Sequence, residues 1–298
     1  MKNSSYLKAI IAFCIFGFMP IYWSSLSHVD STLILFHRSF WIVCSLTPYL
    51  IWKSKLKKSY FVNLGILLKK NWKYLLLSSL AISINWLGYI YSINHGHVIE
   101  AGLAYYLSPL LTIILSLVFL KESMSKKQWI AIACMFLAIF YLLVAKGIFP
   151  KFAFTIGISF SIYGILSRLL QFPILERMLL ETFLIALFLG VFVIDPFLIH
   201  KEFMLSSHLT QGLLVSAGLV SMVPIFLYIA CTKLLKFSTI GILSFILPTQ
   251  ILILSIFYFQ TPWEIENILC MSLLWPSIGL YIFDLYKEQK KTIKVENT

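Results

Sequence analysis

A few charged residues within otherwise apolar sequence are the groups with which this chain could do chemistry. Arg38 and its neighbour His37 lie in the second of ten long apolar stretches, Glu100 lies in the fourth and Glu181 in the seventh. A charged side chain at the centre of a bilayer costs about 2.5–3.5 kcal/mol on insertion scales, so each of these residues needs a structural or functional reason.

Amide and aromatic side chains in neighbouring stretches complete a candidate binding site. Asn85 and Trp86 fall near the middle of the third stretch, and Tyr105 lies in the fourth. An arginine in such surroundings can bind a carboxylate or a phosphate. The predicted substrate-binding or gating residues are Arg38, Glu100, Asn85, Tyr105, Trp86, His37 and Glu181. Two structural roles for Arg38 stay open, an ion pair with Glu100 and extension of the side chain to the membrane interface.

The apolar stretches that must position these residues fill nearly the whole chain. Hydrophobic residues make up 60% and charged residues 12%, whereas a soluble domain has about 25% charged residues. A helix needs roughly 20 apolar residues to cross the hydrocarbon core. The stretches are 6–24, 31–52, 74–94, 98–120, 129–146, 150–170, 176–198, 209–232, 239–259 and 264–285. The sequence therefore predicts an all-α membrane protein with ten transmembrane helices.

The distribution of lysine and arginine predicts the orientation. With the N-terminus inside, twenty basic residues fall in cytoplasmic segments and three in external ones, in agreement with the positive-inside rule. We therefore expect a multi-pass protein of the bacterial cytoplasmic membrane with both termini in the cytoplasm. The net charge of +12 then faces the anionic inner leaflet of the lipid bilayer, and we expect no nucleic-acid partner.

A weak internal repeat divides the chain into two halves. The stretch Gly102–Ser116 resembles Gly241–Ser255, which lies 139 residues further on, and both contain a proline near the middle of a span, Pro109 and Pro248. A repeat of five spans has an odd number of crossings, so the second copy is inverted, as in many secondary transporters. We expect five-helix repeats at 1–146 and 147–298, with helix breaks at the two prolines.

Motifs for other chemistry are missing from the sequence. The five cysteines have no paired spacing, and neither a P-loop, HExxH nor G-x-S-x-G occurs, so we expect no metal, no cofactor and no enzyme. A coupling proton or other ion stays open, as does the oligomeric state. The competing hypothesis is a membrane-embedded enzyme acting on a lipid or polyprenyl substrate, which would need acid and base groups facing one leaflet.

Several short motifs together resemble the RarD-type branch of the EamA family, within the drug/metabolite transporter superfamily. The matching segments are Leu35-Phe36-His37-Arg38, Asn85-Trp86, Asn94 to Ala101, Leu103, Tyr105, Pro109, Phe119-Leu120-Lys121-Glu122, Tyr163-Gly164, Leu180-Glu181-Thr182, Ser238-Thr239-Ile240-Gly241 and Pro248-Thr249. The resemblance implies two inverted five-helix halves around a cavity open to one side at a time. It also implies transport of a small organic metabolite or drug without ATP hydrolysis.

The chain departs from the family pattern at two places. Gln260 and Thr261 stand where the second repeat should end in glutamate, and Ser24 stands where a lysine is expected in the first span. Loss of that outer cation could relax a preference for anionic substrates, so the specificity of this chain is expected to differ from that of its relatives.

Overall fold

A computed structural model describes residues 2–95, 98–147, 151–193, 195, 203–204, 206–258, 260 and 264–296, and the regular secondary structure of these residues is entirely helical. The elements are α1 (Lys2–Ser24), α2 (Ser31–Ser54), α3 (Lys58–Asn94), α4 (Val98–Leu120), α5 (Lys126–Lys146), α6 (Lys151–Leu169), α7 (Ile174–Phe188), a π-helical turn η1 (Leu189–Val193), α9 (His208–Thr232), α10 (Phe237–Leu243), α11 (Ile246–Phe257) and α12 (Ile265–Glu296). The prediction of an all-α protein is therefore confirmed.

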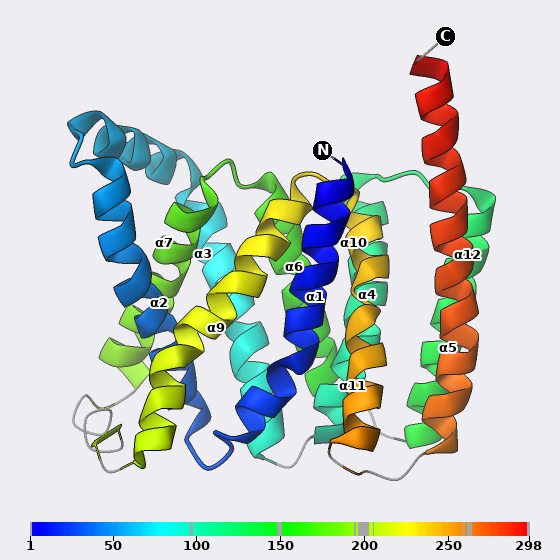
Figure 1. Ribbon diagram of the computed structural model, residues 1–298, viewed down its shortest axis with the longest axis horizontal. Coiled ribbons are helices and arrows are strands. Elements are labelled where there is room, and N and C mark those ends of the chain that lie inside the picture. The colour runs from blue at the N-terminus through cyan, green and yellow to red at the C-terminus, as the bar shows by residue number, and fades with distance from the viewer. Residues whose placement is uncertain are drawn as a thin grey trace.

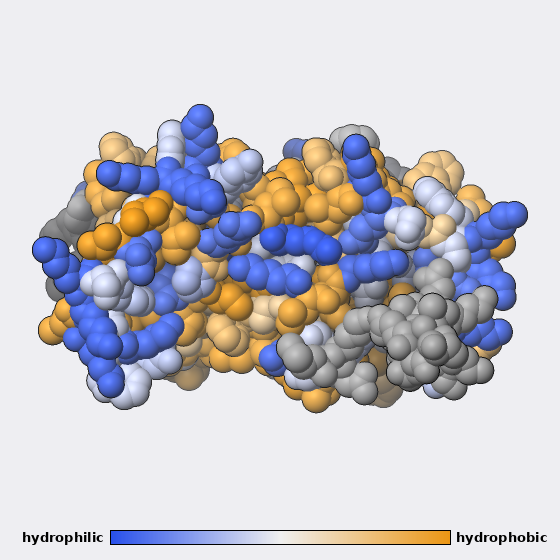
Figure 2. Space-filling view, turned by 90° about the horizontal axis from the view of Figure 1, so that it is seen from above, coloured by the Kyte–Doolittle hydropathy of each residue, from blue (hydrophilic) through white to orange (hydrophobic). Residues whose placement is uncertain are grey.

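The helices stand side by side in one bundle, and both termini lie at the same face of it, which we call the terminal face (Figure 1). Hydrophilic side chains are spread over this face (Figure 2). They include the exposed lysines Lys53, Lys55, Lys57 and Lys58. The segment 53–73, expected to hold a short surface helix, is helical from Lys58 onward and continues without interruption into the third span as α3.

Nine helices among the described residues are long and apolar enough to cross a membrane, and the protein is therefore a multi-pass membrane protein. They correspond to nine of the ten predicted stretches. The remaining stretch, 176–198, begins as α7 and passes into η1. Neither element alone has the length of a span, and part of the stretch beyond Val193 lies outside the described residues.

Only one of the two prolines predicted to break a helix is next to a break. In the second half, Ser244 and Phe245 separate α10 from α11 one turn before Pro248, which cannot donate a backbone hydrogen bond to the preceding turn. In the first half, α4 runs continuously through Pro109, so the break predicted there is wrong. At this point α4 packs closely against α10, because a Cβ on Gly241 would lie 3.0 Å from the Pro109 carbonyl oxygen.

Glu122 fixes the beginning of α10. Its carboxylate accepts hydrogen bonds from the backbone N–H groups of Phe237 (2.7 Å) and Ser238 (3.0 Å) and from the Ser238 hydroxyl (2.7 Å). Arg168 donates to Glu122 at 3.4 Å and to the Leu235 carbonyl at 2.8 Å. An anion bound to free N–H groups stabilises a helix N-terminus, so Glu122, two residues after the end of α4, is tied to the discontinuous pair α10 and α11.

Small residues let the helices approach closely, as expected where lipid supplies no hydrophobic driving force between helices. A Cβ on Gly218 of α9 would lie 2.7 Å from the Ile42 backbone nitrogen and 2.9 Å from the Trp41 carbonyl carbon of α2. These are backbone atoms, which cannot move away from an added Cβ as the end of a flexible side chain can. By contrast, a Cβ on Gly212 of the same helix would meet nothing within 4 Å.

We predict that Gly218→Ala lowers the free energy of unfolding by about 1–3 kcal/mol, because the added methyl group overpacks the contact between α2 and α9. Gly212→Ala is the matched control and should be neutral or stabilising by up to about 1 kcal/mol, from helix propensity. Thermal unfolding in detergent measures both variants. Equal effects of the two substitutions would show that α2 and α9 do not pack in this way.

Candidate functional site

A pocket lies between α1, α2, α3, α4, α6 and the α10–α11 break. Its lining residues are Phe16, Met19, Trp23, Arg38, Asn85, Trp86, Tyr89, Ala104, Tyr105, Ser108, Ile156, Phe160, Ser244 and Leu247. The lining is mostly apolar and aromatic, with a few polar groups. This composition is typical of a site for a small organic molecule.

Arg38 contributes the positive charge of this pocket. The residue is only 5% exposed, and its guanidinium carbon lies 3.6 Å from the centroid of the Trp86 ring and 5.0 Å from that of Trp23. Stacking on indole faces stabilises a guanidinium by cation–π attraction. No carboxylate pairs with Arg38 within the part of the chain that the structure describes, and its buried Nε has no hydrogen-bond partner there.

The other polar groups of the pocket come from three different helices. Asn85 of α3 donates a hydrogen bond of 2.8 Å to the Ile156 carbonyl of α6, which fixes the orientation of the amide. The rings of Tyr89 and Tyr105 meet edge to face at 5.5 Å. These contacts hold α3, α4 and α6 together around the pocket and aim their polar groups into it.

A second, smaller cavity lies next to Trp86. It is lined by Ile42, Ile82, Trp86, Tyr163, Met178, Glu181, Thr182 and Ile225. Trp86 lines both cavities, so its side chain separates the Arg38 pocket from the space beside Glu181. The two cavities therefore follow one another through the bundle.

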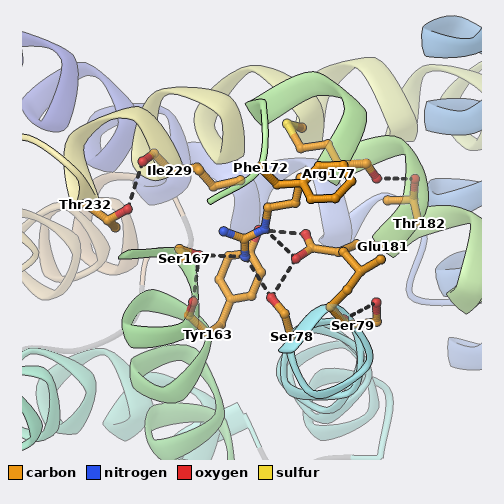
Figure 3. A network of polar contacts seen from close by, with 12 residues as sticks. Ser78, Ser79, Tyr163, Ser167, Phe172, Arg177, Glu181, Thr182, Ile229 and Thr232 are labelled. Atoms are coloured by element: carbon orange, nitrogen blue, oxygen red, sulfur yellow. Dashed lines mark hydrogen bonds and ion pairs between the residues drawn. The ribbon is translucent and has the colours of Figure 1, made fainter. Parts of the chain in front are cut away.

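A buried polar network, which we call the Arg177 network, closes this series near the terminal face (Figure 3). Arg177 is fully buried, and its Nε lies 2.6 Å from Glu181 Oε1. Its Nη2 donates to the hydroxyls of Ser78 at 2.7 Å and Ser167 at 2.8 Å. Its guanidinium carbon lies 5.0 Å from the Tyr163 ring centroid.

Two further hydrogen bonds to Glu181 complete the network. The Ser78 hydroxyl donates to Oε1 at 2.6 Å and the Tyr163 hydroxyl to Oε2 at 3.2 Å. Protein groups thus neutralise the charge of the Glu181 carboxylate and donate hydrogen bonds to both of its oxygens, as is required for a buried ion. The network joins α3, α6 and α7 into one polar cross-link.

The structure places the predicted site residues in three groups. Arg38, Asn85, Trp86 and Tyr105 line one pocket, whereas Glu181 belongs to the Arg177 network. For Glu100, the side chain lies outside the described part of the chain, and its pairing with Arg38 stays a prediction.

His37 lies outside the pocket, because the helical turn points it away from Arg38. Its ring stacks on Phe203 with a centroid distance of 5.1 Å and meets Phe36 edge to face at 5.6 Å. Among the described residues, no group of histidine, cysteine and acidic side chains could hold a metal ion.

Arg177 is the residue that sequence reasoning assigned incorrectly. Its position at a predicted helix end suggested a cytoplasmic charge that orients the protein, but the side chain is buried and ion-paired. Two signals in the sequence could have identified it. It lies four residues before Glu181, a spacing that pairs side chains on a helix, and it lies 139 residues after Arg38, the offset of the internal repeat.

Comparison with known proteins identifies relatives over the full length of the chain. The EamA-like transporter family model matches residues 3–144. The uncharacterized transporter YojE of Bacillus subtilis (strain 168) is 30% identical, over 96% of this chain and 97% of its own. Protein RarD of Escherichia coli (strain K12) is 27% identical, over 97% of both chains. A crystal structure that is 16% identical superposes with a TM-score of 0.66, over 94% of this chain and 98% of its own, and therefore shares the fold.

We predict strong coupling between Arg177 and Glu181 in stability. Arg177→Met or Glu181→Met alone should lower the free energy of unfolding by about 3–5 kcal/mol, because each leaves an uncompensated buried charge. The double variant should recover most of that loss. Unfolding of the three variants in detergent gives the coupling energy, and additive effects of the two substitutions would contradict the ion pair.

Proposed function

The chain belongs to the RarD-type branch of the EamA-like transporter family, and we propose that this membrane transporter moves a small organic metabolite or drug across the bacterial cytoplasmic membrane by alternating access. Transport is secondary, without ATP hydrolysis. The proposed substrate site is the pocket around Arg38, Asn85, Trp86 and Tyr105. The Arg177 network acts as the gate toward the terminal face.

The observation that carries this proposal is the series of two cavities through the bundle. Trp86 lines both the Arg38 pocket and the smaller cavity, and Glu181 is among the residues that line the smaller cavity. A substrate held at Arg38 would reach the terminal face once Trp86 turns and the Arg177 network separates. Helices α3, α6 and α7, which the network joins, would then move apart.

Pairs of residues separated by the repeat offset support two inverted five-helix halves, residues 1–146 and 147–298. Arg38 of α2 and Arg177 of α7 are 139 residues apart, and the two helices start from opposite faces of the bundle (Figure 1). Tyr105 and Ser244 show the same offset, and both line the Arg38 pocket. In transporters of this kind the site lies at the interface of the repeats.

The placement of the termini supports ten crossings. Both termini lie at the terminal face (Figure 1), which requires an even number of spans. Nine helical segments meet the criteria for a span, with α10 and α11 counted together as one of them. The continuous helical segment formed by α7 and η1 supplies the tenth. The lysines on the terminal face favour a cytoplasmic position for it, and both termini would then be cytoplasmic.

The chemistry of Glu181 is compatible with two roles under this proposal. One is gating, and the other is binding of a coupled proton. Its ion pair with Arg177 at 2.6 Å and its hydrogen bonds from Ser78 and Tyr163 favour the gating role. A small-molecule substrate and the lipid bilayer are the only partners that the proposal requires.

We predict that single cysteines report alternating access in a chain whose native cysteines are replaced by serine. Ser108→Cys, in the Arg38 pocket, should react with a membrane-impermeant thiosulfonate from the external side of oriented vesicles. Thr182→Cys, behind the Arg177 network, should react slowly from the cytoplasmic side. Adding Glu181→Gln should raise the Thr182→Cys rate and lower the Ser108→Cys rate, each by about tenfold, because a charged hydrogen bond of about 1.5–3 kcal/mol is weakened.

The matched control is Ser161→Cys, at a fully buried residue between α4 and α6. It should stay unreactive from both sides in every background. Unchanged rates at Ser108→Cys and Thr182→Cys after Glu181→Gln would contradict the gate, and reaction of Ser108→Cys from both sides at once would contradict alternating access.

A further inference from the structure

The environment of Arg38 leaves its charge without a resident counterion in the part of the chain that the structure describes. The guanidinium stacks on Trp86 at 3.6 Å and on Trp23 at 5.0 Å, and the residue is 5% exposed. Aromatic faces compensate a buried cation in part but accept no hydrogen bonds in the plane of the guanidinium. The in-plane N–H groups therefore have capacity to bind an anion.

Arg177, at the equivalent position of the second repeat, shows how this protein compensates such a cation. Its guanidinium stacks on Tyr163 and binds the carboxylate of Glu181 at 2.6 Å. Glu181 follows Arg177 by four residues, whereas Ile42 follows Arg38 by four. The sequence thus places a carboxylate one turn after one arginine and an aliphatic side chain one turn after the other.

The rest of the Arg38 pocket selects against a positively charged ligand group. No described residue that lines it is acidic, and much of the lining is aromatic or aliphatic, including Phe16, Met19, Phe160 and Leu247. An ammonium group would face the charge of Arg38 without a carboxylate to compensate it. Apolar walls around a single cation suit a ligand with one anionic group and an apolar body.

We infer that the substrate of this transporter is an organic monocarboxylate with an apolar or aromatic body, and that its carboxylate binds the guanidinium of Arg38. The inference rests on the proposed function, because it assigns a ligand class to the proposed transport site. Arg38 is the only cationic side chain among the described residues that line the pocket.

The test compares probes that differ only in charge. Phenylacetate, phenylacetamide and phenethylamine share a benzyl body, as do indole-3-acetate, indole-3-acetamide and tryptamine with an indolylmethyl body. The purified full-length protein in detergent should show a higher Tm with the two carboxylates and no change with the amides or amines. A ligand that binds only the folded state stabilises it in this way.

Substitutions at Arg38 test the assigned contact. Arg38→Gln should raise the dissociation constant for phenylacetate, measured by tryptophan fluorescence, by about 100-fold, because one partner of a buried charge pair is lost. Arg38→Lys should lie between this variant and the wild type, since lysine keeps the charge without the planar fork. Lys73→Gln on the exposed surface should retain carboxylate binding and is the control for a general loss of positive charge.

Each failure has a distinct meaning. Stabilisation by an amide or amine as large as that by its carboxylate, or none by either carboxylate, overturns the inferred substrate class. Equal loss of phenylacetate binding in Arg38→Gln and Lys73→Gln would show that binding depends only on overall positive charge and would also overturn it. If phenylacetate binds in an Arg38-dependent manner but shows no counterflow in proteoliposomes, the ligand class is supported and the proposed transport function is contradicted. If phenethylamine shows counterflow and phenylacetate does not, the transport function is supported and the ligand class is contradicted.

Discussion

The constraint on which this structure depends is that a charged side chain inside a membrane must be compensated by other groups. The chain places one arginine in α2 and another in α7, and both are buried. Arg177 is compensated by Glu181, two serine hydroxyls and a tyrosine ring. Arg38 stacks on two tryptophans beside a cavity. The same residue type is therefore ion-paired in α7, whereas no described carboxylate pairs with it in α2.

This asymmetry connects the fold with a transport cycle. Hydrogen bonds among Ser78, Ser167, Arg177 and Glu181 join three helices near the terminal face (Figure 3), while the pocket at Arg38 has no comparable cross-link among the described residues. Separating the network would expose several polar groups at once, which is favourable only if water or a rearranged set of partners replaces the lost bonds. Closure of the pocket around Arg38 requires instead that an anion neutralise the guanidinium. A ligand carboxylate would supply this anion and would couple closure of the Arg38 pocket to separation of the Arg177 network.

The sequence predicted the helical spans well because a run of about twenty apolar residues is typical of a membrane-spanning helix. It also selected Arg38, Asn85, Trp86 and Tyr105, which the fold brings into one pocket, because polar residues in such runs are rare. It assigned Arg177 incorrectly because a basic residue at a helix end usually meets lipid headgroups. Its burial becomes plain in the structure, where Ser78 and Ser167 approach it from two other helices. The uninterrupted course of α4 through Pro109 likewise cannot be predicted from the proline alone.

The central claim is that the Arg177 network holds the terminal face closed over the Arg38 pocket. Pulsed electron–electron distance measurement tests it most directly, with spin labels at Trp72 of α3 and Leu169 of α6, which are each 52% exposed and belong to two of the helices that the network joins. The account predicts one dominant distance in the wild type and a second, longer distance that becomes prominent when Glu181→Gln is introduced. A distance distribution that is the same in both proteins would contradict the claim.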